Sequence, residues 1–212
     1  MKVTIWSDFA CPFCYMEEYM LEKTAREAEL AGKPQVEIEM RAYELSPEAP
    51  VIPSESMEEH FSSAHDISID DARSQMVRIT KMAARAGLDY NLEGVQVCNT
   101  FDAHRLMKLA YDTTDSATAL KLNFALFHAN FIENKRLSDH AVLKEIAVAA
   151  GLDPKAVEDT LTSDRYADKV RADEEEADRF DLEYVPYMQF SDGRILQGVL
   201  SAGAIRKALN GE

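Results

Sequence analysis

Two cysteines with a spacing suited to redox chemistry, Cys11 and Cys14, lie where a short apolar segment gives way to a helical pattern. The first N–H groups of a helix have no partner within the helix and carry partial positive charge. A thiolate on Cys11 would be stabilised there, and Cys14 shares nearly the same helical face. Pro12 suits a first turn because it lacks an N–H group. The pattern predicts a dithiol that can close to a disulfide and reopen.

Two structural interpretations of the same pair are a permanent disulfide and one half of a zinc site. A bridge across so short a loop would remove only about 2 kcal/mol of unfolded-state entropy, which makes it a weak cross-link. A structural zinc site needs four ligands, and the chain offers only Cys98 and five histidines besides the pair. The redox interpretation is therefore favoured, and Cys98 is expected to be a small buried apolar residue.

The composition limits the classes of partner. The 212 residues include 38 acidic and 23 basic side chains, a net charge of −15, which argues against nucleic acid and anionic membranes. No apolar run reaches the ~18 residues of a membrane helix, and the first residues do not resemble a signal peptide. We expect a cytoplasmic protein, monomeric or homodimeric, where a CxxC is more often catalytic than structural. The acidic run over residues 173–178 is expected to be a solvent-exposed helix face.

The elements that position the cysteines are a strand over residues 2–7, a helix over 12–31 and a strand over 35–43. Apolar residues recur along the helix at three- and four-residue spacing with glutamates on the opposite face, and the second strand alternates. A strand, a helix and a second strand with a short return predict a right-handed βαβ unit. The cysteines would lie at the edge where open α/β sheets place ligands.

The rest of the chain completes a small sheet around a helical segment. Three prolines between residues 44 and 56 predict a loop, and from there to about residue 180 the pattern is helical. Asp192 and Gly193 predict a hairpin between strands at 187–191 and 194–197, and Ser201 suits the N-cap of a last helix. We expect an α/β fold in which residues 1–50 and 166–212 form a four-stranded mixed sheet and residues 51–165 are an all-helical insertion.

Several segments resemble a known family. The strand, CxxC and helix at the start, with a proline before a terminal hairpin and helix, resemble the thioredoxin fold, and the helical insertion resembles its DsbA-like branch. The segments Ile5–Asp8, Asn99–Leu106 and Tyr166–Glu174 are similar to the FrnE-type subfamily of thiol–disulfide oxidoreductases. The resemblance covers essentially the whole chain and implies a thioredoxin-like fold with a large helical insertion.

The resemblance also implies roles for individual residues. Cys11 would be the exposed attacking thiol and Cys14 the buried resolving thiol, with Pro12 and Phe13 between them. Val185-Pro186 matches the position of the cis-proline that faces the CxxC and leaves backbone groups free to pair with a substrate strand. No metal or organic cofactor is implied beyond the redox-active disulfide, with glutathione as a candidate co-substrate. The implied partners are a disulfide-bearing protein or small molecule and a redox recycling partner.

Two residues of the helical segment allow two interpretations. Phe101 and His104 share one helical face and either line a substrate pocket near the cysteines or form a capped helix with a buried histidine. Phe13 stands where the subfamily commonly has Trp, and Tyr184 where it commonly has Gly. Because the motif lacks the His of periplasmic DsbA, we expect a weaker oxidant, acting as a reductase or isomerase-like enzyme.

Two other functions are compatible with the same fold. One is a glutathione-dependent isomerase or transferase of the 2-hydroxychromene-2-carboxylate isomerase or kappa glutathione transferase type. Those proteins use serine where this chain has Cys11, so the cysteine pair argues against this function. The other is a chaperone-like binding module. We therefore predict a thiol–disulfide oxidoreductase that works through a mixed disulfide.

Overall fold

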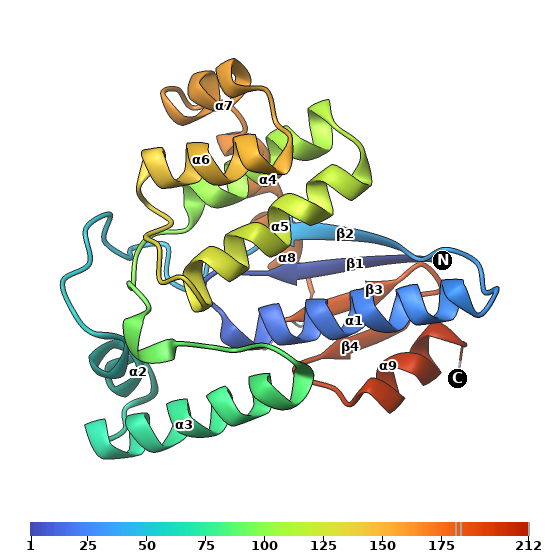
Figure 1. The fold of residues 1–212 in the computed structure, drawn as a ribbon, viewed down its shortest axis with the longest axis horizontal. Helices are drawn as coiled ribbons and strands as arrows, with labels where there is room; N and C mark the ends of the chain where they lie inside the picture. The colour runs from blue at the N-terminus through green and yellow to red at the C-terminus, as the bar shows by residue number, and fades with distance from the viewer. Residues whose placement is uncertain (181, 183, 212) are drawn as a thin grey trace. The chain divides into compact units, whose positions relative to one another are not determined.

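The computed structural model describes residues 1–180, 182 and 184–211 (Figure 1). The chain divides into two compact units. The first, the sheet unit, consists of Met1–Glu44 and Val170–Glu212, and the second, the helical unit, is the continuous stretch Leu45–Lys169.

The unit boundaries agree with the pairing of charged side chains on either side of them. They fall after residues 44 and 169, whereas the sequence suggested 50 and 165. Arg171 donates to Glu44 over 2.6 Å within the sheet unit, and Lys169 pairs with Asp112 over 3.3 Å within the helical unit. Helix α8 (Ala167–Ala177) therefore begins in one unit and continues into the other.

The sheet unit contains the predicted mixed sheet of four strands. Its order is β2-β1-β3-β4, with β1 and β2 parallel and the other neighbouring pairs antiparallel. In the described part of this unit, the sheet is accompanied by the helices α1 and α9 and by most of α8. The bounds are β1 Lys2–Ser7, α1 Pro12–Leu30, β2 Glu37–Ala42, β3 Tyr187–Phe190, β4 Ile195–Gln197 and α9 Ala202–Leu209. The fold class predicted from the sequence is confirmed.

Strand β1 is buried on both faces because helices cover both. Val3 and Ile5 are fully buried, and α1 and α9 pack together along one face of the sheet (Figure 1). On the other face Trp6 packs edge-on against Phe180 and Tyr187, with ring centroids 5.1 and 5.7 Å away. A strand buried on both sides fixes the position of the residues that follow it, which include the cysteines.

The acidic run on α8 is not a purely solvent-exposed face, contrary to the prediction. Asp173 is 2% exposed. Its carboxylate accepts hydrogen bonds from Arg41 at 2.9 Å and from the Ala42 N–H at 2.7 Å, and its carbonyl accepts from Trp6 Nε1 at 3.0 Å. These bonds attach α8 to the end of the edge strand β2, which explains why an acidic residue is buried there.

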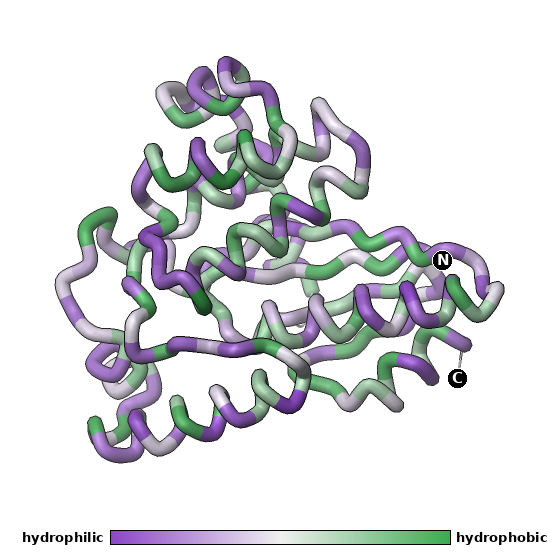
Figure 2. Tube along the Cα trace, viewed as in Figure 1, coloured by the Kyte–Doolittle hydropathy of each residue, from purple (hydrophilic) through white to green (hydrophobic). Residues whose placement is uncertain are grey.

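The helical unit consists of helices that pack in a few pairs. Helix α2 packs against α3, α4 packs against α5 and α7, and α6 packs against α5 and α7. Figure 2 shows hydrophobic and hydrophilic residues alternating along α3, as in a helix with one buried face. The bounds are α2 Met57–His65, α3 Ile69–Ala86, the 3₁₀ turn η1 Leu92–Gly94, α4 Phe101–Thr113, α5 Ser116–Phe131, α6 His140–Ala150 and α7 Pro154–Leu161. No helix in the described part of the chain is long and apolar enough to cross a membrane.

Candidate active site

Cys11 is the N-cap residue of α1, so its sulfur lies at the positive end of that helix. The Cys14 N–H donates to Cys11 Sγ over 3.4 Å, and the Cys11 N–H donates to the Asp8 carbonyl over 3.0 Å. Pro12 occupies the first turn, where its missing N–H has no cost. The chain therefore turns once between β1 and α1 and points the sulfur at the unpaired N–H groups of the helix.

The expectation that Cys11 is exposed is wrong for this structure, in which Cys11 is 4% exposed. Its thiol points at the Val185 carbonyl, with Sγ and the oxygen 4.0 Å apart. The N-cap conformation directs the sulfur toward the helix end, where the Val185 segment contacts it and contributes to its burial. Both cysteines of the motif are free thiols, and so is Cys98, which is buried as predicted.

Cys14 is fully buried, and its environment favours the protonated thiol. Burial raises the pKa of the Cys14 thiol well above its ordinary range, and the neighbouring Cys11 sulfur and the charge of Glu18 act in the same direction. A hydrogen bond from the Asp8 backbone opposes them. The arrangement keeps a proton on the second sulfur while the helix end can stabilise charge on the first.

Val185 and Pro186 lie beside this pair. Both are buried, the peptide bond between them is cis, and Pro186 directly precedes β3. The Pro186 carbonyl accepts a hydrogen bond from the Gly198 N–H at 2.9 Å. The structure therefore brings Cys11, Cys14 and the Val185 carbonyl together, and Phe13, which is half-buried, follows Pro12 in the first turn of α1.

Phe101 and His104 lie on α4, in the helical unit. The Phe101 N–H donates to Asn99 Oδ1 over 2.9 Å, and His104 is buried. Both belong to a different unit from the cysteines, and their contact with substrate stays a prediction.

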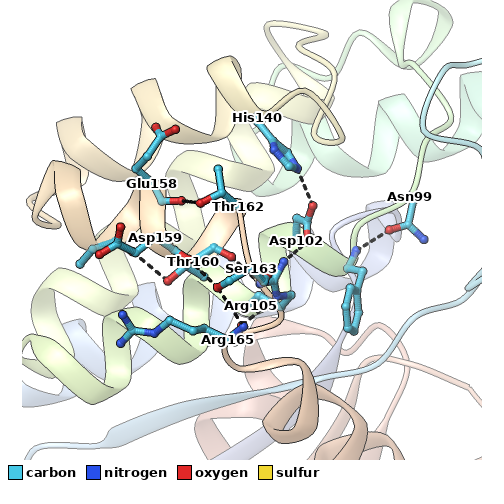
Figure 3. Close-up of polar contacts among 12 residues, drawn as sticks. Asn99, Asp102, Arg105, His140, Glu158, Asp159, Thr160, Thr162, Ser163 and Arg165 are labelled. Atoms are coloured by element: carbon cyan, nitrogen blue, oxygen red, sulfur yellow. Dashed lines mark hydrogen bonds and ion pairs between the residues drawn. The ribbon is translucent and has the colours of Figure 1, made fainter.

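The charged residues beside them have a structural role (Figure 3). Arg105 is buried and donates to the carbonyls of Thr160, Ser163 and Arg165, at and after the end of α7. Arg105 also forms an ion pair with Asp102, with a nitrogen–oxygen distance of 2.6 Å. The other carboxylate oxygen of Asp102 lies 2.7 Å from His140 Nε2. A guanidinium placed at a helix C-terminus satisfies carbonyls that have no partner within the helix, which stabilises that end.

Glu17 is a buried residue that the sequence pattern placed wrongly. The glutamates of α1 were expected opposite the apolar stripe, but Glu17 is 0% exposed and Glu18 is also buried. Glu17 Oε2 accepts the Leu200 N–H at 2.9 Å, and Oε1 has no hydrogen-bond partner among the described residues. Burial raises the pKa of Glu17 to about 7, against the effect of the Leu200 N–H. Helical periodicity cannot reveal this, because the segment that covers Glu17 is distant in sequence.

No group of three or more His, Cys, Asp or Glu side chains in the described residues is arranged to hold a metal ion. A four-stranded sheet with a cysteine pair at the N-terminus of its first helix and a cis-proline beside it defines the thioredoxin-like class of protein. Within this class, residues 2–210 match the family model of the DSBA-like thioredoxin domain. The chain belongs to that family.

Solved structures agree with this assignment. A probable DsbA oxidoreductase from Streptomyces coelicolor is 31% identical, with a TM-score of 0.88 over 100% of this chain and 89% of that one. The cytosolic disulfide reductase DsbM from Pseudomonas aeruginosa, solved with GSH, is 16% identical, with a TM-score of 0.62 over 100% and 98% of the two chains. A 2-hydroxychromene-2-carboxylate isomerase is 16% identical, with a TM-score of 0.72 over 100% and 95%. The last two share the fold. Among curated proteins none matches significantly.

Proposed function

We propose that this protein is a thiol–disulfide oxidoreductase that uses Cys11 and Cys14. The Cys11 thiolate attacks a substrate disulfide, so that a mixed disulfide forms and one substrate thiolate leaves. Cys14 then attacks Cys11 Sγ as its thiol proton passes to the departing substrate sulfur, which leaves as a thiol, and a Cys11–Cys14 disulfide remains. Two electrons pass from the pair to the substrate. The observation that carries this proposal is the Cys14 N–H directed at Cys11 Sγ over 3.4 Å at the helix N-terminus.

The different environments of the two sulfurs support this order of events. Cys11 receives a backbone N–H at a helix end, which stabilises negative charge on its sulfur. Burial raises the pKa of Cys14, which favours the protonated form of the second sulfur. A pair with one stabilised thiolate and one protonated thiol has a defined attacking sulfur and a defined resolving sulfur.

The position of Val185 supports backbone docking of a substrate strand. Its carbonyl lies 4.0 Å from Cys11 Sγ, and Val185 is separated from β3 only by Pro186. An extended substrate that pairs with this backbone would bring its own disulfide to the attacking sulfur. Pro12 and Phe13 would contact the same substrate, and Phe101 and His104 are proposed contacts from the helical unit.

The proposal extends to the direction of electron flow. The motif has no ionisable residue between its cysteines, which favours a reductase or an isomerase-like enzyme of the FrnE type. One structural neighbour is a cytosolic disulfide reductase solved with GSH. We accordingly propose a cytoplasmic reductase with no further cofactor, recycled by glutathione or another thiol partner.

Trapping tests this function. In a Cys14→Ala variant the mixed disulfide on Cys11 cannot be resolved, so disulfide-bearing peptides and lysate proteins should accumulate as adducts that a reductant releases. Cys98→Ala, made in the same background, should leave trapping intact because Cys98 is a buried thiol outside the motif. Absence of adducts on Cys14→Ala, with the wild-type protein unable to reduce any disulfide, contradicts the proposal.

The same variants separate the oxidoreductase from the glutathione-dependent isomerase. Cys11→Ser should abolish disulfide reduction because a serine hydroxyl cannot form the mixed disulfide. An isomerase that only activates glutathione could use a serine there. Retained glutathione-dependent isomerisation of a 2-hydroxychromene-2-carboxylate by Cys11→Ser would favour the second function.

A further inference from the structure

A fully buried carboxyl group connects α1 to the segment that joins β4 and α9. Glu17 lies on α1, two turns after the cysteine motif begins, and its Oε2 accepts the Leu200 N–H at 2.9 Å. Its other oxygen has no hydrogen-bond partner among the described residues. An acid placed in the core with half its hydrogen-bonding capacity unused costs stability. A carboxyl group in such a position suits a role other than stability.

The segment that contains Leu200 is also hydrogen-bonded to the part of the chain that lies beside the attacking sulfur, Cys11 Sγ. Two residues before Leu200, the Gly198 N–H donates to the Pro186 carbonyl over 2.9 Å. Directly before Pro186, the Val185 carbonyl lies 4.0 Å from Cys11 Sγ. The contacts form a closed circuit that leaves α1 at Glu17 and returns to the start of α1 at Cys11.

The circuit has little freedom at Gly198. This residue has φ +74°, a conformation that L side chains rarely adopt, and a Cβ atom there would lie 3.0 Å from Cε2 of Tyr184. The backbone of Gly198 is thus confined on one side by an aromatic ring and bound on the other to Pro186. A displacement at Leu200 would therefore be passed on to Pro186.

From this circuit we propose that Glu17 is a positioning residue, whose carboxyl group fixes Leu200 and, through Gly198, the Val185–Pro186 segment on which substrate docks. The inference rests on the proposed function, because it assigns Glu17 to the docking of the disulfide substrate. Glu17 does not touch the reacting sulfurs in this proposal and acts through the backbone.

The ionisation state of Glu17 should change the strength of its hydrogen bond with the Leu200 N–H. A carboxylate accepts an N–H more strongly than a neutral acid does. Burial raises the pKa of Glu17 to about 7, so the hold on Leu200 tightens as the pH rises through neutrality. Arg206 on α9 is engaged by Glu27 over 3.4 Å, further along α1. Within one turn of Glu17, α1 carries the titratable side chains of Cys14, Tyr15, Glu18 and Tyr19, and α9, which packs against α1, carries Arg206 and Lys207.

Two substitutions separate the hydrogen bond from the charge. Glu17→Gln keeps an oxygen that can accept the Leu200 N–H but cannot ionise, and Glu17→Met fills the same space without an acceptor. Glu27→Gln is the matched control, because it removes an exposed glutamate from the same helix. The chemical shift of the Leu200 amide, followed by NMR in the reduced protein, should titrate near pH 7 in the wild type and in Glu27→Gln. It should be flat in Glu17→Gln, and amide exchange at Leu200 should accelerate in Glu17→Met.

Kinetics test the positioning role with two disulfides. For a disulfide-bearing peptide, Glu17→Met should raise KM by about three- to tenfold, the equivalent of one hydrogen bond. The effect on kcat/KM for 2-hydroxyethyl disulfide, which has no backbone to dock, should be smaller. Glu17→Gln should restore most of the peptide KM and remove its pH dependence around 7.

The outcomes distinguish the two proposals. If the Leu200 amide titrates identically in Glu17→Gln and in the wild type, the proposed role of Glu17 is overturned. It is also overturned if Glu17→Met lowers kcat/KM equally for both disulfides. A wild-type protein that reduces neither disulfide overturns the proposed function instead, while the Leu200 titration still decides whether Glu17 holds that segment.

Discussion

Phe13 is one of the two residues between the cysteines, and its side chain has neither a charge nor a hydrogen-bond donor. The groups that the structure places against Cys11 Sγ are the Cys14 N–H and the Val185 carbonyl. The Cys14 N–H stabilises negative charge on the sulfur, whereas the Val185 carbonyl oxygen, itself an acceptor, opposes it. A thiolate with this limited support gives a less stable reduced form, and thus a lower reduction potential, than one that also faces a cation.

A substitution at this position should make the pair more oxidising. Phe13→His should raise the reduction potential by about 30 mV or more, because an imidazolium near the thiolate contributes roughly 1–2 kcal/mol and 30 mV corresponds to about 1.4 kcal/mol. Equilibration with glutathione redox buffers measures it. Phe13→Trp, the uncharged control, should move the potential much less. A wild-type potential already near the DsbA value of about −120 mV would contradict the underlying argument.

The buried acid at Glu17 should appear in the pH dependence of stability. Folding raises the pKa of Glu17 from 4.5 to about 7, so the folded state binds more protons than the unfolded state in that window. The stability that the neutral acid provides is complete below about pH 4.5 and is lost as the pH rises through 7. Relative to that of Glu17→Gln, the free energy of unfolding of the wild type should fall by about 3 kcal/mol between pH 4.5 and 8.

Urea unfolding of both proteins across this pH range measures the difference. Glu27→Gln, which removes an exposed glutamate from the same helix, is measured alongside as the control. If the difference in free energy of unfolding between wild type and Glu17→Gln stays constant with pH, the pKa of the Glu17 carboxyl group does not change on folding.

At the scale of elements, α8 depends on one buried acid. Asp173→Ala leaves the buried Ala42 N–H without the partner seen in the structure, while Arg41 keeps Glu39 and Glu176, so we expect a loss of about 2 kcal/mol in the free energy of unfolding. Glu175→Ala, on the exposed side of the same helix, should cost within about 0.5 kcal/mol. Thermal or urea unfolding measures both. Equal effects of the two substitutions would contradict the anchoring role of Asp173.

Most elements could be predicted because local signals mark them. The N-cap side chains of Asp139 and Asp153 accept backbone N–H groups at the starts of α6 and α7, and Pro154 lies in the first turn of α7. Helix α2 was not delimited from the sequence, although Ser56 and Glu59 form a capping box at its start.

The parts of the candidate site that could not be predicted depend on distant contacts. Cys11 and Cys14 could be found from their spacing, and Val185-Pro186 from the family resemblance. The burial of Cys11 depends on Val185, and that of Glu17 on Leu200, more than 170 positions along the chain in each case. Periodicity reports which side of a helix is apolar, and it carries no information on which remote segment covers the polar side.

At the scale of the whole molecule, the net charge of −15 should select among small disulfides. A negative protein attracts cationic substrates and repels anionic ones, and salt screens both effects. Raising the ionic strength from about 0.01 M to about 0.1 M shortens the Debye length from about 30 Å to about 10 Å. The kcat/KM for cystamine, a dication, should fall over this range, and that for the anionic glutathione disulfide should rise. Slopes of the opposite signs would contradict this expectation.

The pairing of β1 with both β2 and β3 has a consequence for synthesis of the chain. Its partner β2 follows within the first 42 residues, but β3 begins only at Tyr187, after the whole helical unit. At about 5–20 residues per second, the ribosome needs roughly 10–40 s to deliver that second partner. During this interval the nascent chain carries both cysteines without the Val185 carbonyl beside them, so protection of its thiols falls to chaperones and to the reducing capacity of the surroundings.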